Sequence, residues 1–252
     1  MALDSETRER LVEAARLATL GRLLPSVIHQ LSTPLAAIAL RVEGLQRSVA
    51  GPEAPASREK TQRYLLAMGE ETARCRELLS TLRAFAAGGG RGLAPVDLAA
   101  VCRDVTMLVR HEAMQRQIGI DLAGESVPTV PGQRQRLAQA VLALVLNAVD
   151  ASPSGGRVEI ETRVNDGRVV VTVHDEGSGM PDQVRLRLFE PFVSTREPGQ
   201  GLGLGLMACR AIAEEHGGSI ELQPGSGKGS RLALSVPRDG PAATRETVDG
   251  HS

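Results

Sequence analysis

Apolar residues between Leu24 and Val49 recur at alternating intervals of four and three, which is a heptad pattern. This first stripe consists of Leu24, Ile28, Leu31, Leu35, Ile38, Val42, Leu45 and Val49. A second stripe consists of Leu65, Met68, Thr72, Cys75, Leu79, Leu82 and Ala86. Stripes of this period are typical of helices that pack on other helices, so they predict a helical hairpin. Because two helices alone bury little apolar surface, we expect two copies to form a four-helix bundle.

The pattern changes at AAGGGRGLAP, residues 86–95, whose glycines and proline are typical of a linker. Residues 97–115 then predict a helix, residues 117–124 a strand, and residues 131–152 a helix with Pro131 near its start. Residues 155–177 alternate as two strands around Asn-Asp-Gly, which predicts a hairpin.

A helix is predicted after the glycine-rich loop at 199–205, and two short strands follow it. Strands that come in adjacent hairpins predict an α/β sandwich with a mixed, mostly antiparallel sheet, so the whole chain is of the α+β class. We expect a helical hairpin over 1–87, a linker over 88–94, the sandwich domain over 95–237 and a disordered tail over 238–252.

The composition of the chain argues against nucleic-acid binding. Aromatic residues make up 2% of the chain and the formal charge is −1, so neither stacking platforms nor a basic footprint for nucleic acid is present. Cys75, Cys102 and Cys209 lie far apart and are expected to be ordinary buried thiols in a reducing compartment. The start of the chain is polar, and the apolar run 137–149 is too short to span a bilayer. We therefore expect a cytoplasmic protein without a membrane segment.

The segment SVIHQLSTPLAAI, residues 26–38, places polar residues and a proline inside the first stripe. His29 directly follows Ile28, so it is expected to point sideways toward solvent, and Thr33 shares its face. A lone histidine on a helix is usually an ordinary surface residue. Pro34 costs about 3 kcal/mol in a helix interior, so packing or function must offset it.

Three further segments carry candidate chemistry. Asp175 ends a strand and is followed by Glu-Gly-Ser-Gly, where a carboxylate can bind the edge of a flat ligand while the backbone stays close. Glycines at 199, 201, 203 and 205 precede a helix, whose free N–H groups and dipole favour phosphate. Asn147 interrupts an apolar helix face, and its amide oxygen could bind Mg²⁺ or simply be satisfied in the core.

These segments occur in the order found in sensor histidine kinases of two-component systems, which the sequence resembles over about residues 15–237. HQLSTPL resembles the phosphoacceptor box, LVLNAVDAS the asparagine box, DEGSGMP the first glycine box, LFEPFVST the phenylalanine box and GQGLGLGL the second glycine box. The resemblance implies a phosphoacceptor hairpin that dimerises, and an ATPase domain of the type shared with gyrase, Hsp90 and MutL.

The resemblance also implies a role for each matching position. His29 would be phosphorylated, Thr33 would orient water during dephosphorylation of the partner, and the bend at Pro34 would permit helix rearrangement. Asn147 would bind Mg²⁺, Asp175 would accept the adenine amino group, and Gly177 and Gly179 would shape that pocket. Residues 189–201 would form a lid over ATP. The remaining expected contacts to the nucleotide are Phe189, Thr195, Arg196, Gly201, Leu202, Gly203, Leu204, Gly205 and Ser230.

The chain departs from the family pattern at several positions. Gln30 stands where the family usually has an acid that accepts the imidazole proton, so we expect slow autophosphorylation that Gln30→Glu accelerates. Ala143 replaces a second Asn, Arg196 a Lys, and Ser230 a Thr, and none of these changes alone argues against ATP binding.

The expected partners are a second copy of the chain, the receiver domain of a response regulator and an upstream sensory protein. Two alternatives stay open: a weakly catalytic, nucleotide-binding dimeric scaffold of the same fold, and a MutL-like ATPase clamp. The histidine box argues against the clamp. His174 is expected to be a packing residue, and His111 and His216 are expected to lie outside any chemical cluster.

Overall fold

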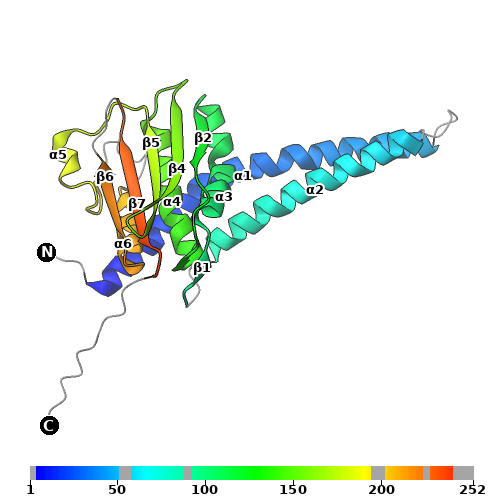
Figure 1. The fold of residues 1–252 in the computed structure, drawn as a ribbon. Coiled ribbons are helices and arrows are strands. Elements are labelled where there is room, and N and C mark those ends of the chain that lie inside the picture. Colours follow the sequence, from blue (N-terminus) through cyan, green and yellow to red (C-terminus); the bar gives the residue numbers. More distant parts are fainter. Residues whose placement is uncertain (1–3, 51–57, 88–91, 194–201, 224–227, 241–252) are drawn as a thin grey trace, which may run out of the picture.

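The computed structural model describes residues 4–50, 58–87, 92–193, 202–223 and 228–240. Two long helices, α1 (Ser5–Ala50) and α2 (Arg58–Ala86), run side by side and project from a globular part (Figure 1). The chain is helical on both sides of the proline-rich segment, and this segment itself lies outside the described residues. The expected helical hairpin is therefore confirmed.

The globular part is built on a five-stranded sheet with the strand order β2-β4-β5-β7-β6. The sheet strands are β2 (Gly119–Gly124), β4 (Arg157–Asn165), β5 (Arg168–Asp175), β6 (Ser219–Gln223) and β7 (Arg231–Pro237). Strands β1 (Ala94–Val96) and β3 (Val130–Gly132) form a separate antiparallel pair. The helices are α3 (Leu98–Gln115), α4 (Arg134–Ala151), α5 (Asp182–Arg185) and α6 (Gly205–Glu215).

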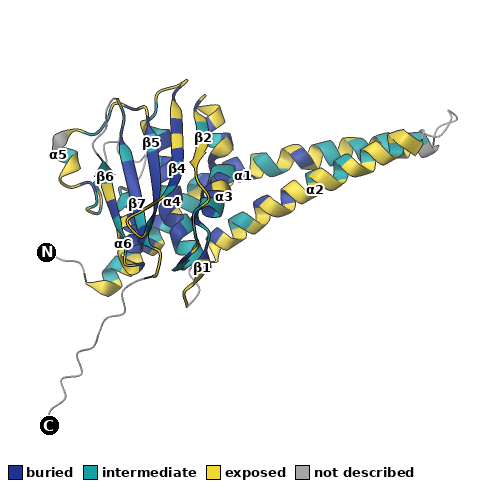
Figure 2. Cartoon of the chain, viewed as in Figure 1, coloured by how far each residue is buried: buried dark blue, intermediate teal, exposed yellow. Residues whose placement is uncertain are grey.

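The sheet is mixed, as expected, because β2 pairs in parallel with β4 while the other neighbours are antiparallel. Helices α3, α4 and α6 cover one face of it (Figure 2). The strand residues that face them are almost fully buried, for example Val171 on β5 and Leu234 on β7. Buried positions alternate along β4, which a period of two predicts, whereas residues 169–173 of β5 are all buried.

Two local features test the sequence patterns. Asp166 and Gly167 both have positive φ, as a two-residue hairpin turn between twisted strands requires, so the expected β4–β5 hairpin is confirmed. The prediction that Pro131 lies in a helix was wrong. Pro131 pairs with Pro95 between β3 and β1, and α4 begins only at Arg134. A proline lacks the N–H that a central strand needs, and this short two-stranded ladder tolerates it.

Helix α1 has two environments along its length. Its first half packs on the helical layer of the globular part, where Val12 and Leu23 are completely buried in the main core. Its second half leaves this layer together with α2, and both helices are largely exposed there (Figure 2). The helix runs without interruption through Pro25 and Pro34. The heptad pattern begins at Leu24, so it did not predict that the preceding residues pack on the sandwich domain.

Helix α1 is also long and apolar enough, by length and composition alone, to cross a membrane. The same test is met by core helices of soluble proteins, and here the helix packs against α2, α3 and α6. The expected absence of a membrane segment, and with it the cytoplasmic location, stays a prediction.

Candidate functional site

The Asp175 carboxyl group is the best-defined feature of the candidate site. It lies at the end of β5 and is only 2% exposed. Its Oδ1 accepts hydrogen bonds from the backbone N–H of Gly177 at 2.9 Å and of Ser230 at 3.2 Å. Within the described residues, Oδ2 has no hydrogen-bond partner. Burial raises the pKa of Asp175, although these two hydrogen bonds act in the opposite direction.

Two glycines let the backbone close around this carboxylate. A Cβ on Gly177 would lie 2.4 Å from the carbonyl oxygen of Ala151 at the end of α4. A Cβ on Gly229, which has a φ of +94°, would lie 1.7 Å from the carbonyl oxygen of Asp175. Both positions therefore require glycine. Gly229 was not among the expected site residues, although its place directly before Ser230 in GKGSRL was a signal for it.

Helix α4 presents one face to the same region. Ala143 lies 3.7 Å from the position that a Cβ on Gly205 would take, so this face meets the start of α6. Asn147 follows one turn later and is half-buried. Its side-chain amide makes no hydrogen bond to any described residue, which leaves its oxygen available. An amide oxygen is a hard ligand of the kind that Mg²⁺ accepts, so the residue fits the metal role expected of it.

The glycine-rich segment packs backbone to backbone against the phenylalanine box. Gly203 has a φ of +63°, and a Cβ there would lie 2.7 Å from the carbonyl carbon of Phe192. The Phe192 N–H donates to the Gly203 carbonyl oxygen at 3.0 Å. Phe192 itself has a positive φ of 65°, a strained conformation for a bulky residue that often marks a functional segment. This contact joins the two boxes.

The other expected nucleotide contacts fall into two groups. Gly179 has a positive φ, Phe189 packs partly against the core, Leu202 is exposed and Leu204 is buried just before α6. Thr195, Arg196 and Gly201, and with them most of the expected lid, lie outside the described residues.

His29 is exposed on α1, but its ring is not free of neighbours. It stacks on the ring of His111 from α3, with ring centroids 4.3 Å apart. The expectation that His111 lies outside any chemical cluster was therefore wrong, because α3 and α1 come together only in the folded chain. The Gln30 side-chain amide donates to the Leu108 carbonyl oxygen at 3.3 Å, and the Thr33 hydroxyl donates to the carbonyl oxygen of His29 at 3.3 Å.

Two other histidines have structural positions. The Nδ1 of His174 lies 3.1 Å from the carbonyl oxygen of Ser230, so the half-buried ring helps to hold β5 on the loop before β7. The Nδ1 of buried His216 donates to the Ile212 carbonyl oxygen at 2.8 Å. Its Nε2 accepts from the N–H of Gln133 at 3.0 Å, which joins the end of α6 to the start of α4.

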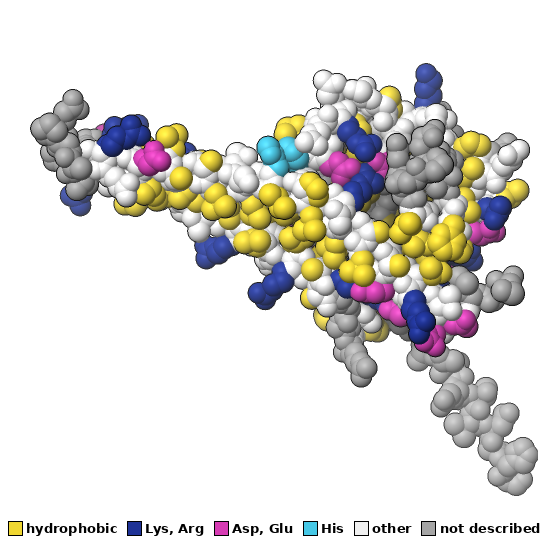
Figure 3. Space-filling view, turned by 180° about the vertical axis from the view of Figure 1, so that it is seen from behind, with side chains coloured by type: hydrophobic (Ala, Val, Ile, Leu, Met, Phe, Trp, Pro, Cys, Tyr) yellow, Lys and Arg dark blue, Asp and Glu magenta, His cyan; other side chains and the backbone are white. Residues whose placement is uncertain are grey.

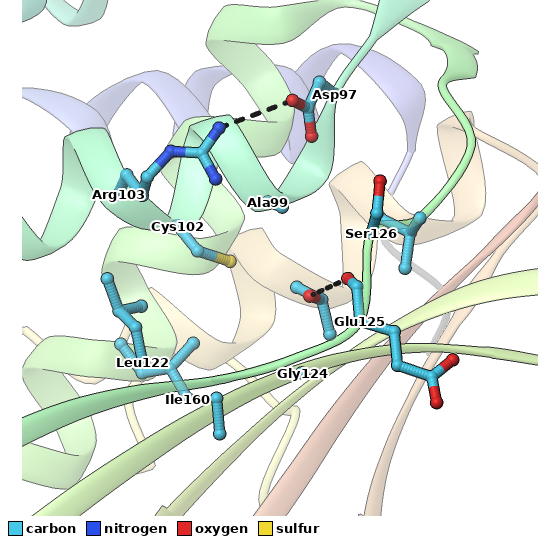
Figure 4. Close-up of a pocket in the computed structure, with 12 residues that line it drawn as sticks. Asp97, Ala99, Cys102, Arg103, Leu122, Gly124, Glu125, Ser126 and Ile160 are labelled. Atoms are coloured by element: carbon cyan, nitrogen blue, oxygen red, sulfur yellow. Dashed lines mark hydrogen bonds and ion pairs between the residues drawn. The ribbon is translucent and has the colours of Figure 1, made fainter.

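A separate cavity of about 410 Å³ lies between α3 and β2 (Figure 4). Asp97 and Arg103 stand on its rim, and Cys102 and Ile160 line its apolar part. Burial raises the pKa of the Cys102 thiol to about 12, so this group stays neutral and unreactive. None of the expected site residues lines this cavity.

Comparison with known proteins identifies both parts of the chain. Residues 19–90 match the His Kinase A (phospho-acceptor) domain, and residues 132–240 match the histidine kinase-, DNA gyrase B- and HSP90-like ATPase. The sensor histidine kinase ZraS of Klebsiella oxytoca is 32% identical over 93% of the chain, and AtoS of Escherichia coli strain K12 is 29% identical over 92%. The chain spans 50% and 37% of the lengths of these two relatives.

Solved structures agree with these matches. The catalytic domain of histidine kinase ThkA is 28% identical, with a TM-score of 0.54, and the similarity covers 58% of the chain and 96% of that domain. The mycobacterial sensor histidine kinase MprB is 27% identical over 59% of the chain, with a TM-score of 0.52, and 99% of that structure is covered. These matches, on a helical hairpin followed by a sandwich domain, show that the chain belongs to the sensor histidine kinases of two-component systems.

Proposed function

We propose that the chain is an ATP-dependent protein histidine kinase that phosphorylates His29 and passes the phosphoryl group to an aspartate of a response regulator. A phosphatase activity toward that regulator belongs to the same proposal. The observation that carries it is the Asp175 carboxylate, with one oxygen held by two backbone N–H groups and the other available to a ligand. An amino group on the edge of a purine is the complementary donor.

The remaining site residues surround the nucleotide in this proposal. Adenine contacts Asp175, with Gly177 and Gly179 shaping the pocket, and the phosphates lie on the glycine-rich segment before α6. The N-terminal end of α6 favours their negative charge. Asn147 would hold Mg²⁺, which neutralises charge on the phosphates. Residues 189–201 act as the lid.

The proposed reaction is an in-line phosphoryl transfer. A ring nitrogen of His29 attacks the γ-phosphorus, the bond to the bridging oxygen breaks, and ADP leaves with the bonding electrons. The attacking atom is the ring nitrogen that carries the lone pair, while the other ring nitrogen carries the proton. The proton on the other ring nitrogen passes to water, since the amide of Gln30 cannot accept it. A missing base costs about 10²–10⁴-fold where one is used, so a slow reaction is expected.

We propose a homodimer on the basis of apolar residues that a single chain leaves exposed. Ile28 and Leu35 on α1 are 61% and 56% exposed, and Leu65 and Leu79 on α2 are also exposed. All four belong to the two heptad stripes. Figure 3 shows apolar side chains gathered along the hairpin. A second hairpin would bury them in a four-helix bundle.

The partners follow from the family. Histidine kinases in general act with response regulators, and we propose a receiver domain as the acceptor of the phosphoryl group on His29. We also propose an upstream sensory protein that acts on α1, and a cytoplasmic location for the two domains.

The first experiment incubates the protein with γ-labelled ATP and Mg²⁺. Wild type is compared with His29→Ala, Asp175→Asn and Gln30→Glu, and each labelled protein is tested for acid lability and base stability. We expect a slow, acid-labile signal in wild type, no signal in the first two variants and a faster signal in Gln30→Glu.

The outcomes separate the kinase from the scaffold. Label in His29→Ala would contradict His29 as the acceptor. No label in wild type or Gln30→Glu, with ATP still bound, would contradict the kinase and favour a dimeric nucleotide-binding scaffold.

A further inference from the structure

Strand β2 forms one edge of the five-stranded sheet, because within the described residues it pairs only with β4 (Figure 1). The N–H groups of Gly119 and Glu125, an even number of residues apart, donate to carbonyl oxygens on the β4 side. Alternate residues of a strand direct their backbone groups to opposite sides. Three residues of β2 therefore direct theirs to the free edge: Ile120, Leu122 and Gly124.

The sequence of β2 does not protect this edge. Protected edges usually carry Lys, Pro or a bulge, or they lie under another segment. The strand reads Gly-Ile-Asp-Leu-Ala-Gly, without Lys or Pro, and its register with β4 contains no bulge. All of its residues except Ile120 are exposed, and Leu122 is 45% exposed. An apolar side chain beside unpaired backbone groups indicates that another segment covers the edge.

The cavity of about 410 Å³ lies directly beside this edge, between β2 and the first turns of α3 (Figure 4). Its apolar lining includes Cys102, Leu122 and Ile160. Arg103 stands on the rim, where its side chain is 61% exposed and its contact to Asp97 is long, at 3.5 Å. A groove between an edge strand and a helix is the geometry in which an extended segment adds a strand. Backbone hydrogen bonds then give the affinity, and the cavity takes side chains of one face.

The chain that leaves β7 leads toward this groove. Gly240 lies against Pro131 of β3, where a Cβ on the glycine would be 3.3 Å from the proline ring. Val127, on the cavity wall, precedes Pro131 by only about 14 Å of fully extended chain. Residues 241–252 lie outside the described residues, and an extended chain of this length spans up to about 40 Å. The segment is therefore long enough to reach the groove and to run along β2.

The charges of this segment match the two sides of β2. In an extended conformation Arg245 points to one face, and three residues share the other: Thr244, Glu246 and Val248. Arg103 lies on the helix side of β2, whereas Asp121 alternates with Leu122 and so faces the open side. With Glu246 turned toward α3, Glu246 meets Arg103 and Arg245 meets Asp121.

We infer that residues 243–248 add a sixth strand to the sheet, antiparallel to β2, with the side chains of one face in the cavity beside α3. The direction follows because the segment enters at the C-terminal end of β2. A tether of a few residues gives an effective concentration in the millimolar range, so weak pairing is enough. The polar composition that predicted a disordered tail does not oppose this, since the affinity comes from the backbone. The added strand closes an edge that would otherwise pair with other chains.

The test compares wild type with three variants: a chain that ends at Gly240, Arg245→Pro/Glu246→Pro, and Gly250→Pro/His251→Pro. Proline has no N–H, so two consecutive prolines inside the segment remove a ladder hydrogen bond whichever alternate residues face β2. The second pair of prolines lies beyond the segment and is the matched control. Amide hydrogen exchange is measured by NMR at the three β2 residues that face the edge, and residues 168–175 report whether the domain stays folded.

We expect exchange at these three amides to be at least about fivefold faster in the truncated chain and in Arg245→Pro/Glu246→Pro, and unchanged in the control. Exchange over 168–175 should be the same in all four proteins. Equal exchange at the edge in wild type and the truncated chain would contradict the added strand. Faster exchange in the control as well would mean that strand pairing is not the cause, and would overturn the inference.

A second copy of the chain is the other possible cover for this edge. Slow exchange that persists in the truncated chain and is lost on dilution would assign the edge to a second copy, and would also contradict the inference. The measurement uses no ATP, so its outcome is independent of the proposed kinase activity.

Discussion

At the scale of single residues, burial of the Asp175 carboxylate lowers the stability of the folded chain at neutral pH. Burial raises its pKa in the folded state, so folding the charged form costs free energy. The contribution of this group to stability is therefore most favourable below the unfolded value of 3.8 and is lost as the pH rises through the higher folded pKa. An Asn keeps an oxygen for the Gly177 and Ser230 N–H groups without the charge.

We expect Asp175→Asn to raise the melting temperature of the nucleotide-free protein by about 1–3 °C at pH 7. The gain should shrink as the pH falls toward 4, and Mg-ATP should stabilise wild type but not the variant. Thermal melts between pH 4 and 8 test this, with Asp166→Asn, at an exposed turn on the same hairpin, as the control. A lower melting temperature for Asp175→Asn at pH 7 would contradict the account.

The sequence predicted residues whose surroundings are local and missed those whose surroundings come from distant segments. Asp175 and Gly177 belong to one short motif, so strand pattern and composition were enough to single them out. Gly229 is required only because the loop before β7 crosses the end of β5, and His111 meets His29 only when α1 docks on α3. Neither of these two contacts produces a periodic pattern in the sequence.

At the scale of elements, the hairpin offers a matched test of the heptad stripe. Leu35 lies on the stripe and Leu40 lies off it, although both are exposed leucines of α1, at 56% and 66%. We expect Leu35→Glu to convert the dimer to a monomer, because two charges would meet in the bundle core, whereas Leu40→Glu remains a dimer. Light scattering on the purified proteins measures this. A dimer in both variants, or dissociation in both, would contradict the proposed seam.

Among the elements, the hydrophobic pattern of the sequence predicts the long strands but not the short ones. Strands β4, β5 and β7 are each seven or more residues long. Buried positions alternate along β4, whereas β5 and β7 contain runs of consecutive buried residues. Strands β1 and β3 are three residues each, too short for a pattern. Pro95 in β1 was assigned to the linker, and Pro131 in β3 to the start of α4. The sequence correctly predicted a helix for the first half of α1, but it did not predict that this half packs on the ATPase domain.

At the scale of the whole molecule, the buried half of α1 joins the hairpin to the ATPase domain in one hydrophobic core. The expected linker at residues 88–94 stays a prediction. The packing of α1 on the ATPase domain adds a contact between the parts of the chain on either side of it. A core that includes residues from both sides of a linker is expected to unfold as one cooperative unit.

Val12→Ala tests this coupling. Val12 is completely buried in that core, so the lost methyl groups and the resulting cavity should lower the free energy of unfolding by about 1–3 kcal/mol. Because about 1 kcal/mol shifts the melting temperature of a protein of this size by roughly 2–4 °C, calorimetry should show a single transition moved down by several degrees. Leu17→Ala, at an exposed position on the same helix, should change it little. A separate early transition, with the ATPase domain melting as in wild type, would mean that the two parts fold independently and that the docked helix adds nothing to the stability of the domain it covers.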